Sequence, residues 1–148
     1  MDPSDPSALI AELPDWNNGA GISAEAWIGC VGTFELAVGY SLVFWPRFVR
    51  VDGLVLREGF SPDALRSCAA GGADPAGVEA LMNHLHIADL HCGGASPSEE
   101  QLRYLGRVLK EVHEAKLARD FPDLRFTVEF NDEPGLDPID YQLTFWQP

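Results

Sequence analysis

The chain has 148 residues, of which 46% are hydrophobic and 10% are aromatic, a composition that excludes a disordered polypeptide and suits one folded domain. Ten Lys and Arg residues against 23 Asp and Glu residues give a formal net charge of −13 at pH 7. Such a charge argues against nucleic acid and anionic membrane surfaces as partners, and it favours a basic protein.

The amino-terminal residues 1–14 are acidic and contain several prolines, so we expect a loose arm on a single domain that spans residues 1–148. They lack the basic start and apolar run of a secretory leader, and no uncharged apolar stretch reaches the roughly 20 residues of a membrane span. Cys30, Cys68 and Cys92 are odd in number and widely spaced, which predicts free thiols in a cytosolic protein. We expect no cofactor, and the sequence leaves the oligomeric state open.

Two apolar patterns overlap between residues 27 and 45. Large apolar residues recur every three or four positions, as on one face of a helix, and over residues 34–45 they also alternate, as in a strand. The helical phase begins after Ser23, a good N-cap residue, and continues to Pro46, so the helix is favoured while the strand stays open. Because the segment is apolar on most sides, we expect its second half to be a buried central helix.

Residues 48–57 predict a β-hairpin, because two short apolar runs flank Asp52-Gly53, a dipeptide that tolerates the positive φ angles of a tight turn. A single strand that begins at Leu54 is the alternative. Three later helices are each predicted to begin where a capping side chain precedes a proline. These starts are Ser61-Pro62, Asp74-Pro75 and Ser96-Pro97.

The helix predicted over residues 97–120 has the most complete pattern. Ser96 and Glu99 are spaced as a capping box, and oppositely charged residues four positions apart line the exposed face. After this helix, alternation over residues 126–130 and 139–145 predicts two antiparallel strands joined by a polar loop. We therefore expect an α+β fold, in which a small, mainly antiparallel sheet with a C-terminal β-hairpin packs against three or four helices.

Residues 83–92 are the one segment that suggests chemistry, because three of the four histidines and one cysteine lie there. His84, His86 and Asp89 are ligand types that zinc accepts. On a strand the two imidazoles would point the same way and could share an ion, whereas on a helix they would diverge by about 200°. The helix start at Asp74 favours a helix through the histidines, so we expect no metal site and interpret the histidines as groups that cap the helix end.

Asp89 and Lys116 each fall on the apolar face of a predicted helix, where a lone buried charge is unfavourable. One interpretation is that the two helices pack together and that Asp89 meets Lys116 or His113. The other is that both charges lie at frayed, solvated helix ends. The candidate polar site consists of His84, His86, Asp89, His91, His113 and Lys116.

Three short stretches carry a resemblance to other proteins. They are Phe44-Trp45-Pro46-Arg47-Phe48, Val51-Asp52-Gly53 and Asn83-His84-Leu85-His86-Ile87-Ala88-Asp89. Together they resemble an uncharacterised family of small bacterial proteins, over most of the chain from about Trp16. The resemblance implies a bacterial cytosolic protein and assigns no role to any residue.

Signatures of common enzyme classes do not occur in the sequence. There is no glycine-rich phosphate loop and no nucleophile elbow. The leading expectation is therefore a non-catalytic acidic interaction module, of the inhibitor or immunity type, that binds a basic protein. The alternative is a metal-dependent enzyme or metal-binding protein that uses His84, His86 and Asp89.

Overall fold

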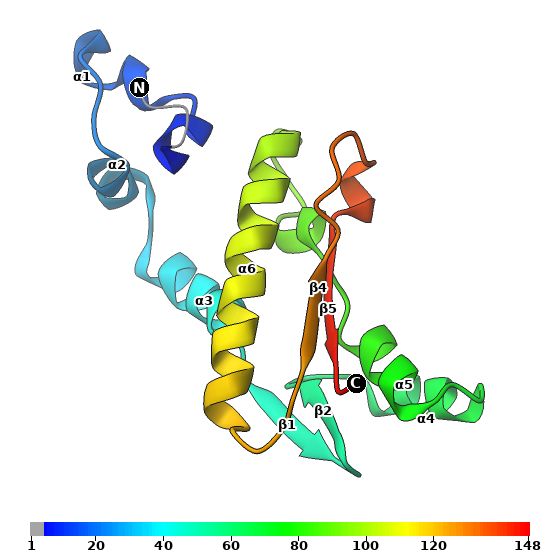
Figure 1. The fold of residues 1–148 in the computed structure, drawn as a ribbon. Helices are drawn as coiled ribbons and strands as arrows, with labels where there is room; N and C mark the ends of the chain where they lie inside the picture. Colours follow the sequence, from blue (N-terminus) through cyan, green and yellow to red (C-terminus); the bar gives the residue numbers. More distant parts are fainter. Residues whose placement is uncertain (1–4) are drawn as a thin grey trace. The chain divides into compact units, whose positions relative to one another are not determined.

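Six α-helices and two small antiparallel sheets make up residues 5–148, the part of the chain that this computed structural model describes (Figure 1). The predicted α+β class and the predicted C-terminal hairpin are confirmed. Contacts within the chain divide it into two compact units, one that ends at Ser41 and one that spans Leu42–Pro148. The single domain expected over residues 1–148 stays a prediction.

The first unit begins with two short 3₁₀ turns, Pro6–Leu9 and Leu13–Asp15. The Asp5 carboxylate caps the first turn by accepting a hydrogen bond from the Ser7 N–H at 2.9 Å. The second turn buries Leu13, which is 3% exposed. The predicted loose arm therefore contains local structure from Asp5 onward, and its residues 1–4 lie outside the described part of the chain.

A left-handed turn and a short helix follow. The turn α1 (Trp16–Gly19) has positive φ angles at Asn17 and Asn18, and asparagine is one of the few residue types that adopt this conformation readily. Helix α2 (Ala24–Val31) begins at Ser23, whose hydroxyl accepts a hydrogen bond from a backbone N–H of the first turn at 3.1 Å. The predicted cap at Ser23 is confirmed.

Of residues 34–45, all but Trp45 fold as a helix and none as a strand, so the favoured interpretation is confirmed. The predicted continuous stripe is split into α2 and α3 (Phe34–Phe44), because the Thr33 hydroxyl accepts a hydrogen bond from the Leu36 N–H at 3.1 Å and begins a new helix. The predicted burial is wrong. No residue of α3 is buried, and Phe34 is 90% exposed.

The second unit opens with the predicted hairpin. Strands β1 (Phe48–Val51) and β2 (Leu54–Arg57) pair antiparallel. Asp52 and Gly53 both have positive φ angles, as a two-residue hairpin turn requires. The local chemistry of this dipeptide was therefore sufficient to predict the turn.

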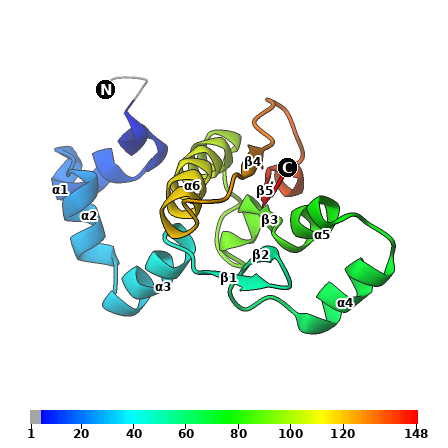
Figure 2. The ribbon, with the colours of Figure 1, turned by 60° about the horizontal axis from the view of Figure 1, so that its bottom comes forward.

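The next two helices begin at the predicted residues. Helix α4 (Pro62–Ala70) is capped by the Ser61 hydroxyl, and helix α5 (Pro75–Met82) by the Asp74 carboxylate. In each, proline occupies the first helical position, where the missing N–H leaves no hydrogen bond unmade. Figure 2 shows α5 beside β2 and β5, whereas α4 lies on its outer side.

The long helix α6 (Glu99–Asp120) lies along the sheet formed by β3 (Leu85–His86), β5 (Gln142–Trp146) and β4 (Thr127–Phe130), in that order (Figure 1). All three strands pair antiparallel. The core of the unit lies between helix and sheet. Its buried members are Val55, Ile87, Leu102, Leu109, Leu117, Val128, Tyr141, Leu143 and Phe145.

The capping box of α6 is real but lies two residues later than predicted. Ser98 is the N-cap, and its side chain and that of Gln101 exchange hydrogen bonds with each other's backbone N–H groups at 3.1 and 2.9 Å. Ser96 and Glu99 have the same spacing, so the local rule could not separate the two serines. Glu99 instead accepts a hydrogen bond from the Gly135 N–H at 3.1 Å, which ties the hairpin loop to the helix.

An ion-pair cluster holds the same loop from the other side. Asp132 accepts hydrogen bonds from Nε of Arg103 at 2.7 Å and from Nε of Arg107 at 2.8 Å. Burial alone would raise the pKa of Asp132, but the two arginines hold that pKa below its usual value. The carboxylate is therefore charged at neutral pH and fixes the loop after β4 against α6.

Candidate functional site

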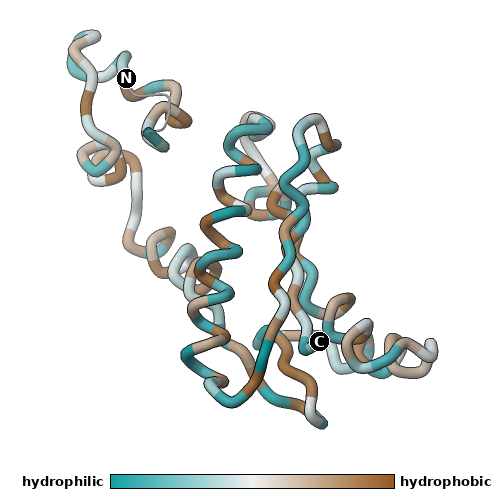
Figure 3. The backbone as a smooth tube through the Cα atoms, viewed as in Figure 1, coloured by the Kyte–Doolittle hydropathy of each residue, from teal (hydrophilic) through white to brown (hydrophobic). Residues whose placement is uncertain are grey.

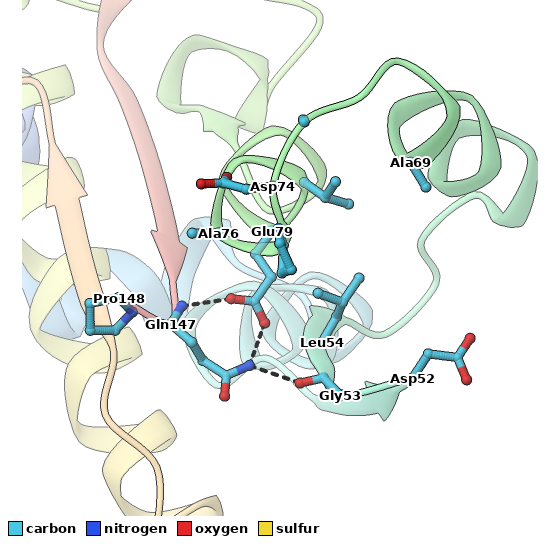
Figure 4. Close-up of a pocket in the computed structure, with 12 residues that line it drawn as sticks. Asp52, Gly53, Leu54, Ala69, Asp74, Ala76, Glu79, Gln147 and Pro148 are labelled. Carbon is cyan, nitrogen blue, oxygen red and sulfur yellow. Dashed lines mark hydrogen bonds between the residues drawn. The ribbon is translucent and has the colours of Figure 1, made fainter.

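A buried carboxylate on α5 joins the two sheets. Glu79 is 1% exposed and accepts a hydrogen bond from the Val55 N–H at 2.6 Å. It also accepts hydrogen bonds from the backbone and side-chain N–H groups of Gln147 at 2.6 and 2.7 Å (Figure 4). The Gln147 side chain also donates to the Gly53 carbonyl at 3.0 Å. Both oxygens of the carboxylate are thus engaged by the protein itself.

Asn83, at the end of α5, also bonds to both sheets, and we call Glu79 and Asn83 together with their hydrogen-bond partners the frame. Oδ1 of Asn83 accepts a hydrogen bond from the Arg57 N–H at 3.1 Å, and its Nδ2 donates to the carbonyls of Val55 at 2.9 Å and Phe145 at 3.3 Å. These main-chain groups lie on the edge of β2 that faces away from β1 and, on β5, beyond the short stretch that pairs with β3. Neither Glu79 nor Asn83 was predicted as a site residue. The available signal was that Glu79 is a charged residue within an otherwise apolar helix and that Asn83 is a polar residue at the end of that helix.

A cavity of about 660 Å³ opens beside this frame, lined by residues of β2, α4, α5 and the C-terminal segment (Figure 4). Much of its wall is small and apolar, including Ala69, Ala73 and Ala76. Both oxygens of the Glu79 carboxylate at its wall already accept hydrogen bonds, three in all, from Val55 and Gln147. We therefore assign Glu79 to the frame and not to ligand binding.

The histidine-bearing segment is not the helix that was predicted. Helix α5 ends at Met82, Leu85–His86 forms strand β3, and Ile87–Leu90 is a 3₁₀ turn. The helix stops because the Asn83 side chain is committed to the strand edges and because Leu85 pairs with Leu143 of β5. These partners are distant in sequence, so the local apolar periodicity that favoured a longer helix was misleading.

The extended backbone brings two of the candidate residues together. The rings of His84 and His86 lie 5.1 Å apart between centroids, with an interplanar angle of 87°. Nδ1 of His84 lies 2.5 Å from the Leu81 carbonyl oxygen, and Nδ1 of His86 lies 2.7 Å from the Ile139 carbonyl oxygen. His84 therefore caps the end of α5, as expected, whereas His86 is positioned by a carbonyl that is distant in sequence.

Asp89 pairs with neither Lys116 nor His113, so the first of the two interpretations of these charges is wrong. Asp89 is exposed in its 3₁₀ turn, as His91 is just after it. Lys116 is 8% exposed, donates to Asp120 one turn later, and lies 5.6 Å above the ring of Trp45. The second interpretation, in which both charges are solvated, is correct for Asp89. It is wrong for Lys116, which is buried and packs its ammonium group against the ring of Trp45.

His113 lies inside the core, 2% exposed, with its ring edge-on to Phe48 at 5.7 Å between centroids. Its Nδ1 lies 2.7 Å from the Leu109 carbonyl oxygen one turn earlier. Burial lowers the pKa of His113 to about 4, and the positive charge of Arg57 acts in the same direction against the raising effect of the Leu109 bond. The imidazole is therefore neutral at pH 7 and acts as a core residue.

The first unit presents an apolar helical surface that sequence analysis had placed in the core. Along α3 the tube in Figure 3 is mostly brown or pale, which marks apolar and weakly polar residues. Large side chains on α2 and α3 are between 36% and 90% exposed. This apolar helical surface comprises Ile28, Val31, Phe34, Leu36, Val38 and Tyr40.

The stretch of sequence that carries this surface has charge of one sign. Up to Ser41 the sequence contains no Lys, Arg or His, while Glu12, Asp15, Glu25 and Glu35 are present. Exposed large apolar side chains gathered on two successive helices mark an interaction site more often than apolar residues scattered singly over a surface. The signal in the sequence was the near absence of charge over residues 26–46, where Glu35 stands alone.

No group of three or more His, Cys, Asp or Glu side chains that could hold a metal ion occurs among residues 5–148. Within those same residues, no helix has the length and apolar character needed to cross a membrane. The cysteines are free thiols, as predicted. Comparison with protein-family models, curated proteins and solved structures gives no match.

Proposed function

We propose that the protein is a non-catalytic interaction module of a bacterial cytosol that binds a basic protein through its apolar helical surface. The observation that carries this proposal is the exposure of six large apolar side chains on α2 and on the part of α3 before Leu42. A helix that is apolar on all sides is normally covered. With 11 residues, α3 is too short to be covered by spanning a bilayer.

The charge of the molecule favours one kind of occupant. A second copy of the chain would bring together two surfaces that both carry Glu25 and Glu35, from a stretch of sequence that has no Lys, Arg or His up to Ser41. An anionic membrane would be repelled in the same way. A protein with an apolar groove edged by Lys and Arg would be attracted and steered to the surface. Such an acidic cap on a basic partner is how an inhibitor or immunity-type protein would act.

The test compares two matched double-serine variants of the full chain. Phe34→Ser with Val38→Ser changes the apolar helical surface, whereas Leu81→Ser with Ile139→Ser changes two other exposed apolar residues, 55% and 48% exposed. Each variant and the wild type would be used to capture partners from the native host, and the captured protein would then be purified for binding measurements.

We expect a captured partner of high isoelectric point, whose dissociation constant increases at least tenfold with the Phe34 and Val38 changes and less than twofold with the control changes. Raising the salt concentration from 50 to 300 mM should lower the association rate several-fold. Equal binding by both variants would refute the proposal. Dimerisation or vesicle binding that depends on Phe34 would refute it as well, because the surface would then have a different occupant.

A further inference from the structure

The side chains of His84 and His86 lie close together, 5.1 Å apart between ring centroids. His84 follows the end of α5, and His86 lies in β3, where its backbone pairs with Gln142 of β5. The two residues are separated by a single position in extended backbone, so their side chains leave the same side of the chain.

The hydrogen bonds of the two rings determine which nitrogen is available. A carbonyl oxygen can only accept, so the Nδ1 atoms that face Leu81 and Ile139 must carry the ring protons when the rings are neutral. Nε2 of each ring then has a free electron pair. Metal-ligating histidines in proteins share this feature, since their second nitrogen usually donates to a carboxylate or a backbone carbonyl that orients the ring.

The ring separation also agrees with shared coordination. A zinc–nitrogen bond of about 2.0–2.1 Å places the centre of an imidazole roughly 3.2 Å from the ion. Two such rings at a tetrahedral angle would have centres about 5.2 Å apart, close to the 5.1 Å between His84 and His86.

We propose that His84 and His86 bind one divalent ion of the zinc, nickel or copper type through their Nε2 atoms. Imidazole nitrogen suits these ions. Because no third His, Cys, Asp or Glu completes a cluster in the described part of the chain, the remaining positions of the ion are open to water or to a ligand from another molecule. Two protein ligands imply a moderate affinity.

Calorimetric titration of the untagged full chain with Zn²⁺ alone tests the proposal. We expect one ion per chain with a dissociation constant in the micromolar range. His84→Ala and His86→Ala should each weaken binding at least tenfold, and the double variant should abolish it. His91→Ala, which removes a neighbouring exposed histidine, should leave binding within twofold of wild type.

Nuclear magnetic resonance of the histidine rings adds a direct reading of the ligands, because Zn²⁺ should shift the ¹⁵N signals of Nε2 in two imidazoles and leave both Nδ1 atoms protonated. Absence of binding below 1 mM would overturn the proposal, as would binding that survives in the double variant. Neither result bears on the proposed partner, because the His84 and His86 changes leave the apolar helical surface intact.

Discussion

At the scale of single residues, the side chain of Asn83 makes hydrogen bonds to backbone groups of β2 and β5 that a neighbouring strand would otherwise make. Its amide meets three main-chain groups on the edges of β2 and β5. Because those groups are buried or half-buried, losing their partner would leave them unsatisfied, which is more unfavourable than losing a solvent-exposed hydrogen bond. The two sheets of the second unit are held together at this point by one polar side chain and its neighbour Glu79.

We expect Asn83→Ala to lower the free energy of unfolding by about 3 kcal/mol, since it removes three hydrogen bonds and leaves their partners unpaired. The matched control is Asn131→Ala, which removes one exposed hydrogen bond, to the Asp140 carbonyl, and should cost less than about 1 kcal/mol. Urea unfolding followed by tryptophan fluorescence measures both. Equal effects of the two changes would show that Asn83 does not join the sheets.

His113 makes stability depend on pH in a defined direction. Its pKa is about 4 in the folded protein against an ordinary value of 6.5. Between these values the unfolded chain binds a proton that the folded protein excludes, so the free energy of unfolding decreases as pH falls through this range. The contribution is fully present above the unfolded pKa, and about 2 kcal/mol of it should be lost between pH 7 and pH 5.

His113→Gln tests this linkage, because glutamine can still donate to the Leu109 carbonyl and does not titrate. The variant should lose about 2 kcal/mol less stability than wild type between pH 7 and pH 5. Unfolding in urea at several pH values measures the difference between the two proteins. The carboxylates are the same in both, so their effect on stability cancels in that difference. Parallel pH profiles of the two proteins would mean that His113 is accessible to protons in the folded state.

At the scale of elements, one glycine sets the distance between α6 and β4. A Cβ atom built on Gly106 would overlap the ring of Phe130, although alanine would otherwise favour the helix by about 1 kcal/mol. The close approach of helix and strand therefore requires glycine at this position. Helix propensity alone would favour alanine at position 106, so the need for glycine comes from packing against Phe130.

We expect Gly106→Ala to destabilise the protein by about 2 kcal/mol, because either the helix or the ring must move. In a Phe130→Ala background the same change should be neutral or slightly stabilising, since the space is then open. A double-mutant cycle by urea unfolding measures the coupling. Additive effects would place the cost elsewhere than in the contact with Phe130.

The elements that could be predicted are those whose signals are local. The turn at Asp52-Gly53 and the starts of α4 and α5 each depend on residues adjacent in sequence. The end of α5 depends on strand edges that Asn83 reaches across 28 and 62 positions. No local pattern contains those partners, which is why the histidine segment was predicted as helix and its convergent rings were missed.

At the scale of the whole molecule, the burial of α3 was predicted from a rule that assumes a covering surface within the same chain. The rule identified the segment as apolar but could not identify what covers it. The apolar helical surface was therefore missed as a surface, although its segment was correctly identified as apolar on most sides. The acidic composition, in contrast, could be read directly and supports the same kind of partner.

The core of the second unit does not require the first. Every buried member of the hydrophobic core lies between Val55 and Phe145, and the half-buried residues packed against it begin at Val43. We therefore expect a chain that begins at Leu42 to fold cooperatively, with a urea midpoint close to that of the full protein. It should also bind less of the dye ANS, which reports exposed apolar surface, because the apolar helical surface is removed.

The same shortened chain shows which properties belong to the second unit alone and which need the first. It should retain the pH dependence due to His113 and lose the affinity for the basic partner that the full chain binds. Calorimetric unfolding, dye fluorescence and partner binding would be measured on the two chains side by side. A broad, non-cooperative transition in the shortened chain would mean that residues before Leu42 are part of its folding unit. The proposal that the second unit folds alone while the first binds the partner would then be wrong.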